Sequence, residues 1–156
     1  MTFETAMVTD VISVTPGTSI EVALKILIEK KIRAMPVVDK NNKYLGMFDF
    51  HQVWGHLLPS FVKMDVGPEH FSFLKGSDDY VVERLDEIRD TNVEEVMNTK
   101  RPHLKPGTAY WEVLLQMYKH GSPLAVVDPS TKKLKGLISS QVVISDLERH
   151  MFSENK

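Results

Sequence analysis

The side chains best suited to chemistry in this chain are cationic, and they stand beside short apolar runs. Arg33 comes directly before the apolar run 34–38, where a guanidinium could reach a ligand phosphate. Lys100, Arg101 and His103 stand together at the start of another extended run, and their three basic side chains could hold a polyphosphate. The alternative for both groups is a solvated surface charge, the ordinary role of short basic runs.

Asp49 lies between an apolar run and a predicted helix, which suits two roles. Its carboxylate could hold Mg²⁺ brought in with a nucleotide. The simpler role is the N-cap of the following helix, which we favour. His51 and His56 are five residues apart and do not share a helix face as a zinc-binding i, i+4 pair would. We therefore expect no metal site.

Composition and missing motifs argue against several classes of protein. The chain has no P-loop, no Gly-x-Ser-x-Gly and no His-Glu-x-x-His, so we expect no enzyme activity. Its net charge of −2 disfavours nucleic acid and anionic membranes as partners. No apolar run approaches the ~20 residues that span a bilayer, and no signal peptide is recognisable. With no cysteine at all, a cytoplasmic location is expected.

The sequence repeats itself after ninety residues. Pro16-Gly17-Thr18 recurs as Pro106-Gly107-Thr108, and Gly46 recurs as Gly136. Such self-similarity predicts two like units, each too small to bury a core of its own. We therefore expect a pseudo-symmetric pair that shares one core, with a ligand cleft between the halves.

Hydrophobic periodicity and turn residues predict the elements of the first unit. A helical turn at 2–9 and an extended segment at 12–14 come first. Thr18 and Glu21 form a capping-box pattern before a helix whose apolar face is Ile20, Ala23, Leu24, Leu27 and Ile28. Strands are predicted at 34–38 and 44–48, with Gly46 at a close approach of backbones, and a helix then runs from 49 or 50 to 58.

The second unit has the same order of elements, βαββα. Thr91 and Glu94 are predicted to cap a turn near Met97, and Thr108 to cap a helix that ends at Gly121. The apolar face of that helix is Tyr110, Val113, Leu114, Met117 and Tyr118. Strands follow at 123–127 and 134–138, and the last helix begins at Ser139 or Ser140. The predicted units are repeat 1 at 1–58, a connector with one amphipathic helix at 59–90, and repeat 2 at 91–156.

These motifs together resemble the tandem cystathionine-β-synthase (CBS) domain pair, or Bateman module. The likeness is carried by Met7-Val8-Thr9-Asp10, Ile12-Ser13-Val14-Thr15-Pro16-Gly17-Thr18, Arg33-Ala34-Met35-Pro36-Val37-Val38-Asp39 and Gly46-Met47-Phe48, and in the second copy by Val96-Met97, Leu104-Lys105-Pro106-Gly107-Thr108, Ser122-Pro123-Leu124-Ala125-Val126-Val127-Asp128 and Gly136-Leu137-Ile138-Ser139. The resemblance implies an α/β (α+β) fold of two pseudo-symmetric βαββα CBS repeats packed through their sheets, here as a stand-alone module.

The resemblance also implies a regulatory function. Such modules bind adenosine-containing ligands (AMP, ADP, ATP or S-adenosylmethionine) between their repeats, require no cofactor, pair into homodimers and act on an effector protein, which for this chain is unknown. The alternative is a ligand-free dimerisation or protein-interaction module. Trp54 and Trp111 are expected to pack on the faces of the module, and an exposed Trp would suit a dimer contact.

The ligand site implied by the resemblance draws on both repeats. Its candidate residues are Ser13, Arg33, Ala34, Met35, Pro36, Asp49, Gln52, Lys100, Arg101, Ser122, Pro123, Leu124, Ser139 and Val142. In the family, backbone amides hold adenine, a Ser or Thr holds the phosphate and an Asp holds the ribose. This chain departs from that pattern, because Asp49 would repel a phosphate and Val142 cannot accept a hydrogen bond from ribose.

Overall fold

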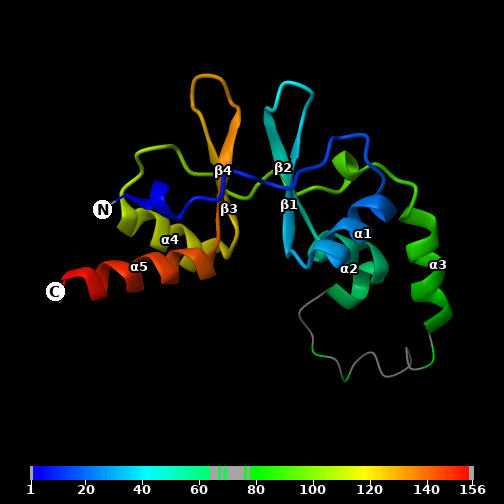
Figure 1. The fold of residues 1–156 in the computed structure, drawn as a ribbon. Coiled ribbons are helices and arrows are strands. Elements are labelled where there is room, and N and C mark those ends of the chain that lie inside the picture. Colours follow the sequence, from blue (N-terminus) through cyan, green and yellow to red (C-terminus); the bar gives the residue numbers. More distant parts are fainter. Residues whose placement is uncertain (1, 64–66, 68, 70–75, 77, 155–156) are drawn as a thin grey trace.

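The computed structural model describes residues 2–63, 67, 69, 76 and 78–154. Two β-hairpins stand side by side at its centre, and helices flank them on both sides (Figure 1). The helices are α1 (Ile20–Lys30), α2 (Phe50–Leu57), α3 (Asp78–Ile88), α4 (Tyr110–His120) and α5 (Ser140–Glu154), the strands are β1 (Ala34–Val38), β2 (Tyr44–Asp49), β3 (Leu124–Val127) and β4 (Leu134–Ile138), and short 3₁₀ turns are η1 (Phe3–Ala6), η2 (Ser60–Lys63) and η4 (Val93–Glu95).

Each repeat contributes one two-stranded antiparallel sheet, β1–β2 or β3–β4. The first predicted extended segment of each repeat forms only a single parallel bridge, Val14 to Val37 and Leu104 to Val126. Pro36 lies inside β1, where it has no N–H to donate. On either side of it, the Val14 N–H donates to the Pro36 oxygen and the Val38 N–H donates to the Val14 oxygen. The predicted strands are confirmed to within one residue at each end.

The predicted threonine caps are wrong, whereas the helices themselves are present. Ser19 caps α1 by accepting a hydrogen bond from the Val22 N–H, and Ala109 stands at the cap position of α4 without a side-chain bond. The hydroxyls of Thr18 and Thr108 face back into the preceding Pro-Gly turn, where Thr108 donates to the Lys105 oxygen at 2.7 Å. The cap position of each helix lies one residue beyond the threonine, at Ser19 or Ala109, and the threonine hydroxyl contacts the turn instead.

The prediction of a cap formed by Thr91 and Glu94 is also wrong. Asn92 stands at the cap position of η4, with no side-chain hydrogen bond there. The predicted apolar faces were too wide, since Ile28 is 65% exposed and Tyr118 is 88% exposed. Gly121 ends α4 as predicted, with the positive φ of 83° that glycine adopts readily, and the predicted connector helix is α3.

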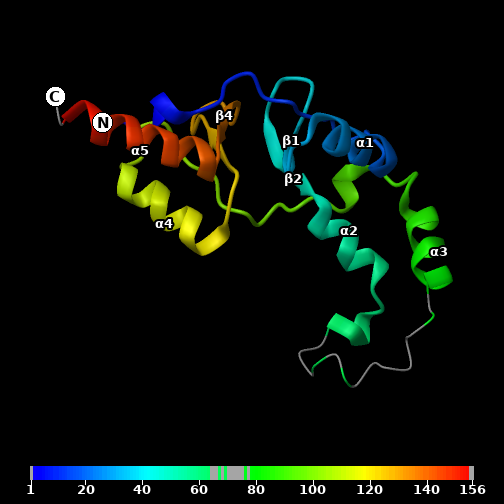
Figure 2. The same ribbon diagram turned by 60° about the horizontal axis from the view of Figure 1, so that its bottom comes forward.

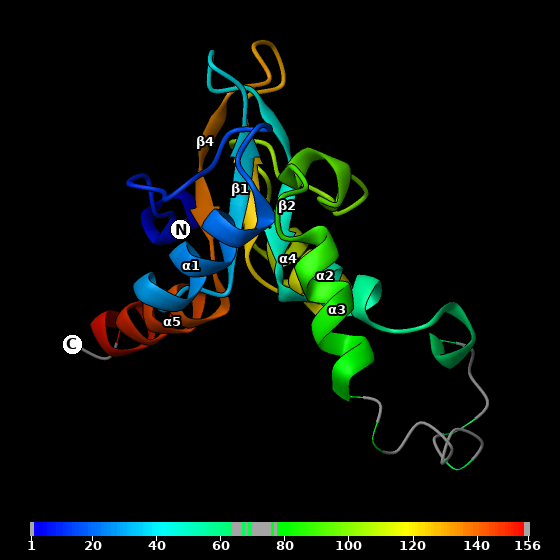
Figure 3. The same cartoon turned by 90° about the vertical axis from the view of Figure 1, so that its right-hand side faces the viewer.

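Three apolar clusters hold the molecule together. One lies in repeat 1 around Phe48 and Leu27, and another in repeat 2 around Leu124 and Ile138. The third lies between the hairpins and consists of Ala34, Val38, Met47, Ala125, Val127 and Leu134. Because its members come from all four strands, the repeats are packed through their sheets, as the sequence predicts. The hairpin tips also pair, with the Leu134 N–H donating to the Asn42 oxygen at 2.9 Å (Figure 3).

The segment that leads into each repeat packs on the other repeat. We call residues 3–8 and 93–98 the lead segments. Phe3 and Ala6 are buried in the core of repeat 2, and Val93 is buried in the core of repeat 1. In Figure 1 the blue N-terminal segment lies beside α4 and α5 before it crosses to α1. Each repeat therefore completes its core with a segment that precedes the other in sequence.

Two glycines allow these lead segments to cross the strands. The Val8 and Leu137 backbones exchange hydrogen bonds of 2.8 and 2.9 Å, and Asn98 and Met47 form the matching pair at 2.8 and 3.0 Å. A Cβ on Gly136 would lie 2.5 Å from the Val8 oxygen, and one on Gly46 would lie 2.9 Å from the Asn98 oxygen. The close approach predicted at Gly46 is confirmed, and Gly136 is the place of a second one.

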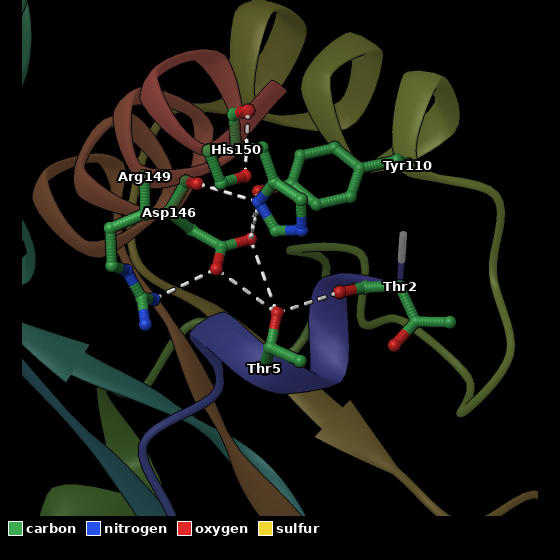
Figure 4. A network of polar contacts seen from close by, with 7 residues as sticks. Thr2, Thr5, Tyr110, Asp146, Arg149 and His150 are labelled. Carbon is green, nitrogen blue, oxygen red and sulfur yellow. Dashed lines mark hydrogen bonds and ion pairs between the residues drawn. The ribbon is translucent and has the colours of Figure 1, made fainter. Parts of the chain in front are cut away.

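A buried carboxylate anchors the first lead segment. Asp146 on α5 is 1% exposed and accepts hydrogen bonds from the Thr5 hydroxyl at 3.0 Å and the Tyr110 hydroxyl at 3.0 Å (Figure 4). Arg149 on the same helix forms an ion pair with it at 2.8 Å. Burial and the hydrogen bond to Asp146 raise the pKa of Tyr110 to about 12. The network joins η1, α4 and α5, and it fixes where the chain continues towards residue 8.

On the opposite side of the molecule, α3 packs beside α2. Arg84 on α3 donates from Nε to the His56 oxygen of α2 at 3.1 Å. Figure 2 shows α1, α2 and α3 on one side of the hairpins and α4 with α5 on the other. Among the helices that the structure describes, none is both long and apolar enough to cross a membrane. The unassigned first half of the predicted connector falls mostly outside the described residues.

Replacing either crossing glycine with alanine is expected to destabilise the fold. Gly136→Ala should lower the free energy of unfolding by about 1–3 kcal/mol, because its methyl group would press on backbone that cannot move aside. Gly46→Ala should have a smaller effect in the same direction. Urea denaturation measures both. Gly55→Ala in α2, which meets no atom within 4 Å, is the control and should leave stability unchanged or raise it. Equal effects at all three positions would contradict the crossing geometry.

Removing the buried carboxylate is expected to release the first lead segment. Asp146→Ala should cost about 1–3 kcal/mol of unfolding free energy, because the Thr5 and Tyr110 hydroxyls lose their acceptor. A double-mutant cycle with Thr5→Val should give a coupling energy above about 0.5 kcal/mol. Glu148→Ala, at an exposed position on the same helix, is the control. Additive effects of Asp146→Ala and Thr5→Val would show that the two side chains do not act together.

Candidate functional site

A pocket of about 450 Å³ lies between the two repeats. Four segments form it: the chain after the first lead segment, the turn from α1 to β1, the residues before β3, and the turn from β4 to α5. Its lining residues are Val8, Asp10, Val11, Ile12, Lys31, Ile32, Arg33, Ala34, Ser122, Pro123, Leu137, Ser139 and Gln141. We call this the inter-repeat pocket. Its volume is within the usual range for small-molecule sites.

The inter-repeat pocket combines apolar walls with two cations. Val8, Ile12 and Leu137 supply apolar surface on which a flat ring could lie. Neither Lys31 nor Arg33 forms an ion pair with any residue that the structure describes, and both are exposed. Asp10 is the carboxylate in the lining, so the charged side chains sum to one positive charge. The pocket is therefore suited to an anionic ligand with an apolar ring.

The end of α1 places these two cations. Lys31 is the C-cap and adopts a left-handed conformation with φ of 54°, and its N–H donates to the Ile28 and Leu27 oxygens. Non-glycine residues adopt such a conformation uncommonly, and here it reverses the chain from helix to strand within three residues. Because β1 starts at Ala34, Lys31 and Arg33 are held at the mouth of the pocket between two rigid elements.

Two serines face the pocket from the other repeat. Ser122 Oγ accepts a hydrogen bond from the Ser140 N–H at 2.9 Å, which ties the chain before β3 to the start of α5. Ser139 Oγ lies 3.5 Å from the Val142 N–H, at the long end for a hydrogen bond. The Ser139 hydroxyl can therefore still donate its proton and accept another bond from a ligand.

The structure brings together part of the predicted site. Arg33, Ala34, Ser122, Pro123 and Ser139 all line the inter-repeat pocket. The other predicted residues do not line it: Ser13 is exposed, Met35, Pro36 and Leu124 are buried, Val142 packs against the core of repeat 2, and Asp49, Gln52, Lys100 and Arg101 lie elsewhere. The side chains of Met35 and Leu124 are fully buried in the two cores, so they are not available to a ligand.

Asp49 and Gln52 form the N-terminal cap of α2. Asp49 Oδ1 accepts from the His51 N–H at 2.7 Å, and Gln52 Oε1 accepts from the Asp49 N–H at 2.7 Å. The capping role favoured for Asp49 is confirmed. Gln52 also borders a hollow of about 470 Å³ between α2 and the following segment, on repeat 1 and away from the inter-repeat pocket.

Arg101 is paired with protein groups instead of facing solvent. Its Nη1 lies 3.7 Å from Asp49 Oδ2, and its Nη2 donates to the His120 oxygen at 3.0 Å. The guanidinium also lies near Tyr44, where burial raises the pKa of the phenol to about 12 although the positive charge of Arg101 lowers it. His103 contacts the Tyr44 ring edge-on, with ring centroids 5.8 Å apart.

The three cations of the predicted phosphate clamp therefore have different surroundings in the structure, and the clamp stays a prediction. Arg101 is bound to Asp49, His103 lies on Tyr44, and Lys100 is exposed. The polar residues that sequence reasoning missed are Asp10, Lys31 and Gln141, and the apolar ones are Val8, Val11, Ile12, Ile32 and Leu137; all of them line the pocket. Lys31 has a usable signal, because it lies two residues before the candidate Arg33, at the end of a predicted helix. Gln141 had no such sequence signal, because only the folded turn from β4 into α5 places it beside the pocket. Among the described residues, no group of three or more His, Asp or Glu side chains could hold a metal ion.

Part of this chain matches a known protein family. The family model of the CBS domain matches residues 3–53. A comparison with curated proteins gives no match. The fold is similar to that of protein MJ1225 from Methanocaldococcus jannaschii, a putative archaeal homolog of g-AMPK, with a TM-score of 0.74 and 19% identity. The similarity covers 94% of this chain and 47% of MJ1225, so this chain spans about half of that protein.

Two other similar structures contain ligands. CBSX2, a CBS-pair protein of Arabidopsis thaliana, in complex with AMP has a TM-score of 0.71 and 19% identity, over 96% of this chain and 98% of CBSX2. CbpB of Listeria monocytogenes in complex with c-di-AMP has a TM-score of 0.70 and 20% identity, over 96% of this chain and 97% of CbpB. The chain thus matches the CBS-domain model at residues 3–53, and along its described length it has a fold similar to that of a CBS-pair protein.

Proposed function

We propose that this chain is a non-enzymatic regulatory module that binds an adenosine-containing ligand in the inter-repeat pocket. The observation that carries the proposal is the pocket itself, where Lys31 and Arg33 have no ion-pair partner among the described residues. Placing a phosphate between them would give these cations a partner, and Ser139 can donate a further bond to it. CBS-pair proteins are generally regulatory, and similar structures hold AMP or c-di-AMP.

Ligand binding in this pocket would act on the arrangement of the repeats. Val8, Lys31 and Arg33 come from one repeat of the sequence, and Ser122 and Ser139 come from the other. A ligand that contacts both sides stabilises the arrangement in which these contacts form. Its effect is limited by the difference between its affinities for the two arrangements. We propose that an effector protein binds differently to the two arrangements of the repeats. We also propose that the module acts in the cytoplasm, which suits a chain with no cysteine.

We propose that the chain is divided into two repeats and a connector at the predicted bounds. Repeat 1 is 1–58, the connector is 59–90 and repeat 2 is 91–156. The exchange of lead segments means that neither repeat has its complete core without the other. We therefore propose that the pair, and not the single repeat, is the folding and ligand-binding unit.

Homodimerisation is a second proposed function, supported by a specific observation. Three residues of α4, Trp111, Leu115 and Tyr118, lie on one helix face and are 67%, 37% and 88% exposed. On α5, Ile144, Met151 and Phe152 are also exposed. The two helices are adjacent (Figure 2), and we propose that their exposed apolar side chains contact a second copy of the chain. Trp111 was expected to pack within the module, and its exposure favours the alternative that it contacts a second copy.

Ligand binding can be tested by thermal unfolding with AMP, ADP, ATP, S-adenosylmethionine and c-di-AMP. A ligand at 100 times its Kd should stabilise the fold by about 2.7 kcal/mol, which corresponds to several degrees for a domain of this size. Arg33→Ala should weaken binding of the active ligand about tenfold or more, because a charged hydrogen bond is lost. Lys30→Ala removes a neighbouring cation that does not line the pocket and should leave Kd unchanged. A flat response to the whole panel would refute the adenosine-ligand proposal.

Self-association can be tested by sedimentation velocity over a hundredfold range of concentration. We expect a dimer, and we expect Trp111→Ser with Tyr118→Ser to shift it to monomer, because two large apolar side chains leave the interface. Val82→Ser on α3 removes an apolar side chain of similar exposure, 65%, and is the control. A monomeric wild-type protein, or a dimer that both variants leave unchanged, would contradict this interface.

A further inference from the structure

The inter-repeat pocket has a counterpart on the other side of the pseudo-symmetry axis. The repeats are related by an offset of ninety residues. At this offset Val11 is equivalent to Arg101, and Ser139 is equivalent to Asp49. Val11 and Ser139 both line the inter-repeat pocket. The residues in the equivalent places of the other cleft are therefore Arg101 and Asp49, and we call their surroundings the counterpart cleft.

In the counterpart cleft the two equivalent side chains reach each other. Arg101 Nη1 and Asp49 Oδ2 are 3.7 Å apart, and the Arg101 and Asp49 side chains are only 11% and 20% exposed. Arg101 Nη2 also donates to the His120 oxygen, and a Cβ built on Gly121 would lie 3.3 Å from this nitrogen. The guanidinium thus occupies space between the end of β2 and the end of α4.

The open pocket lacks such a bridge because its equivalent residues are short and uncharged. Val11 has no polar atom in its side chain, and a Ser139 hydroxyl cannot span the distance that a guanidinium covers. Among the positions at which the two clefts differ, these two act directly on the place of a phosphate. Both act in the same direction, since one fills the cleft and the other places a negative charge where a phosphate would lie.

We infer that the Asp49–Arg101 ion pair closes the counterpart cleft, so that the chain binds one ligand in the inter-repeat pocket and none in its symmetry mate. This inference deepens the proposed function and rests on it. It assigns Arg101 and Asp49 as determinants of binding stoichiometry.

Displacing the pair is unfavourable for an anionic ligand. A phosphate that takes Arg101 away from Asp49 leaves the carboxylate without its partner beside the new negative charge. Removing one partner from a largely buried pair is far more costly than breaking an exposed one. The Arg101 backbone is held as well, because its N–H donates to Asn98 Oδ1 at 3.1 Å, next to the crossing at Met47.

The sharpest test exchanges the residues of the two clefts. Asp49→Ser with Arg101→Val gives the counterpart cleft the side chains of the open pocket at these two positions, and serine keeps a capping group for α2. With AMP as the probe in isothermal calorimetry, we expect one site per chain in the wild type and two in this double variant. Asp86→Ser with Arg89→Val removes an exposed ion pair of the same residue types on α3, and it should leave one site. Two sites in the wild type, or one site in the exchanged variant, would overturn the inference.

The reverse exchange tests the same idea without opening a cleft. Val11→Arg with Ser139→Asp should close the inter-repeat pocket and weaken AMP binding at least tenfold, while circular dichroism and Tm report whether the variant is folded. Unchanged affinity in a folded reverse variant would overturn the inference.

One readout needs no ligand and separates this inference from the proposed function. Arg101 Nε is buried and has no hydrogen-bond partner among the described residues, so its N–H should exchange slowly with water in ¹⁵N spectra. The Nε–H of the exposed Arg89 should exchange much faster. If no variant binds AMP, the ligand proposal fails for that nucleotide, and slow exchange at Arg101 still supports closure. Exchange as fast as that of Arg89 would show that the counterpart cleft is open.

Discussion

The architecture depends on one constraint: each lead segment must cross a strand of the other repeat at backbone contact distance. Only glycine leaves room for this, and it does so at Gly46 and Gly136. The crossings bring Val93 into the core of repeat 1 and Phe3 into the core of repeat 2. A unit of this size hides too little apolar surface alone, so mutual completion of the two cores is the physical reason why the repeats occur as a pair.

The same crossing creates the pocket. After Val8 pairs with Leu137, the chain continues through Asp10 and Ile12 along the groove between the hairpins. Asp146 holds the start of this segment by bonding Thr5 and Tyr110, so a wall of the pocket is attached to α5 through a buried polar network. Satisfied networks of this kind define one arrangement, because each donor left without its acceptor would be costly. The pocket wall formed by Asp10 and Ile12 is thus linked through Thr5 and Asp146 to α4 and α5, the helices with exposed apolar side chains.

Electrostatics then separates two clefts that the fold makes equivalent. On one side Lys31 and Arg33 have no ion-pair partner among the described residues, and on the other Arg101 is bound to Asp49 and His120. The backbone is pseudo-symmetric, whereas the charges are not. Under the proposed function, a ligand would contact the side with the unpaired cations, and the side joined by the Asp49–Arg101 ion pair would keep its arrangement.

The sequence by itself determined the repeat, the four strands, the five helices and the close approach at Gly46, because these depend on local periodicity and on residues with few conformational options. Through the family resemblance it also indicated Arg33, Ser122 and Ser139 as candidates, and all three line the pocket. Only the tertiary structure decided which candidates share one pocket, that Lys31 and Asp10 join them, and that Arg101 faces Asp49. Those outcomes depend on contacts between segments that are far apart in the sequence, from 49 to 101 in the ion pair and from 10 to 139 in the pocket. The threonine caps failed for a related reason, because each helix begins one residue later than the pattern predicts, and the hydroxyls of Thr18 and Thr108 contact the turn before it.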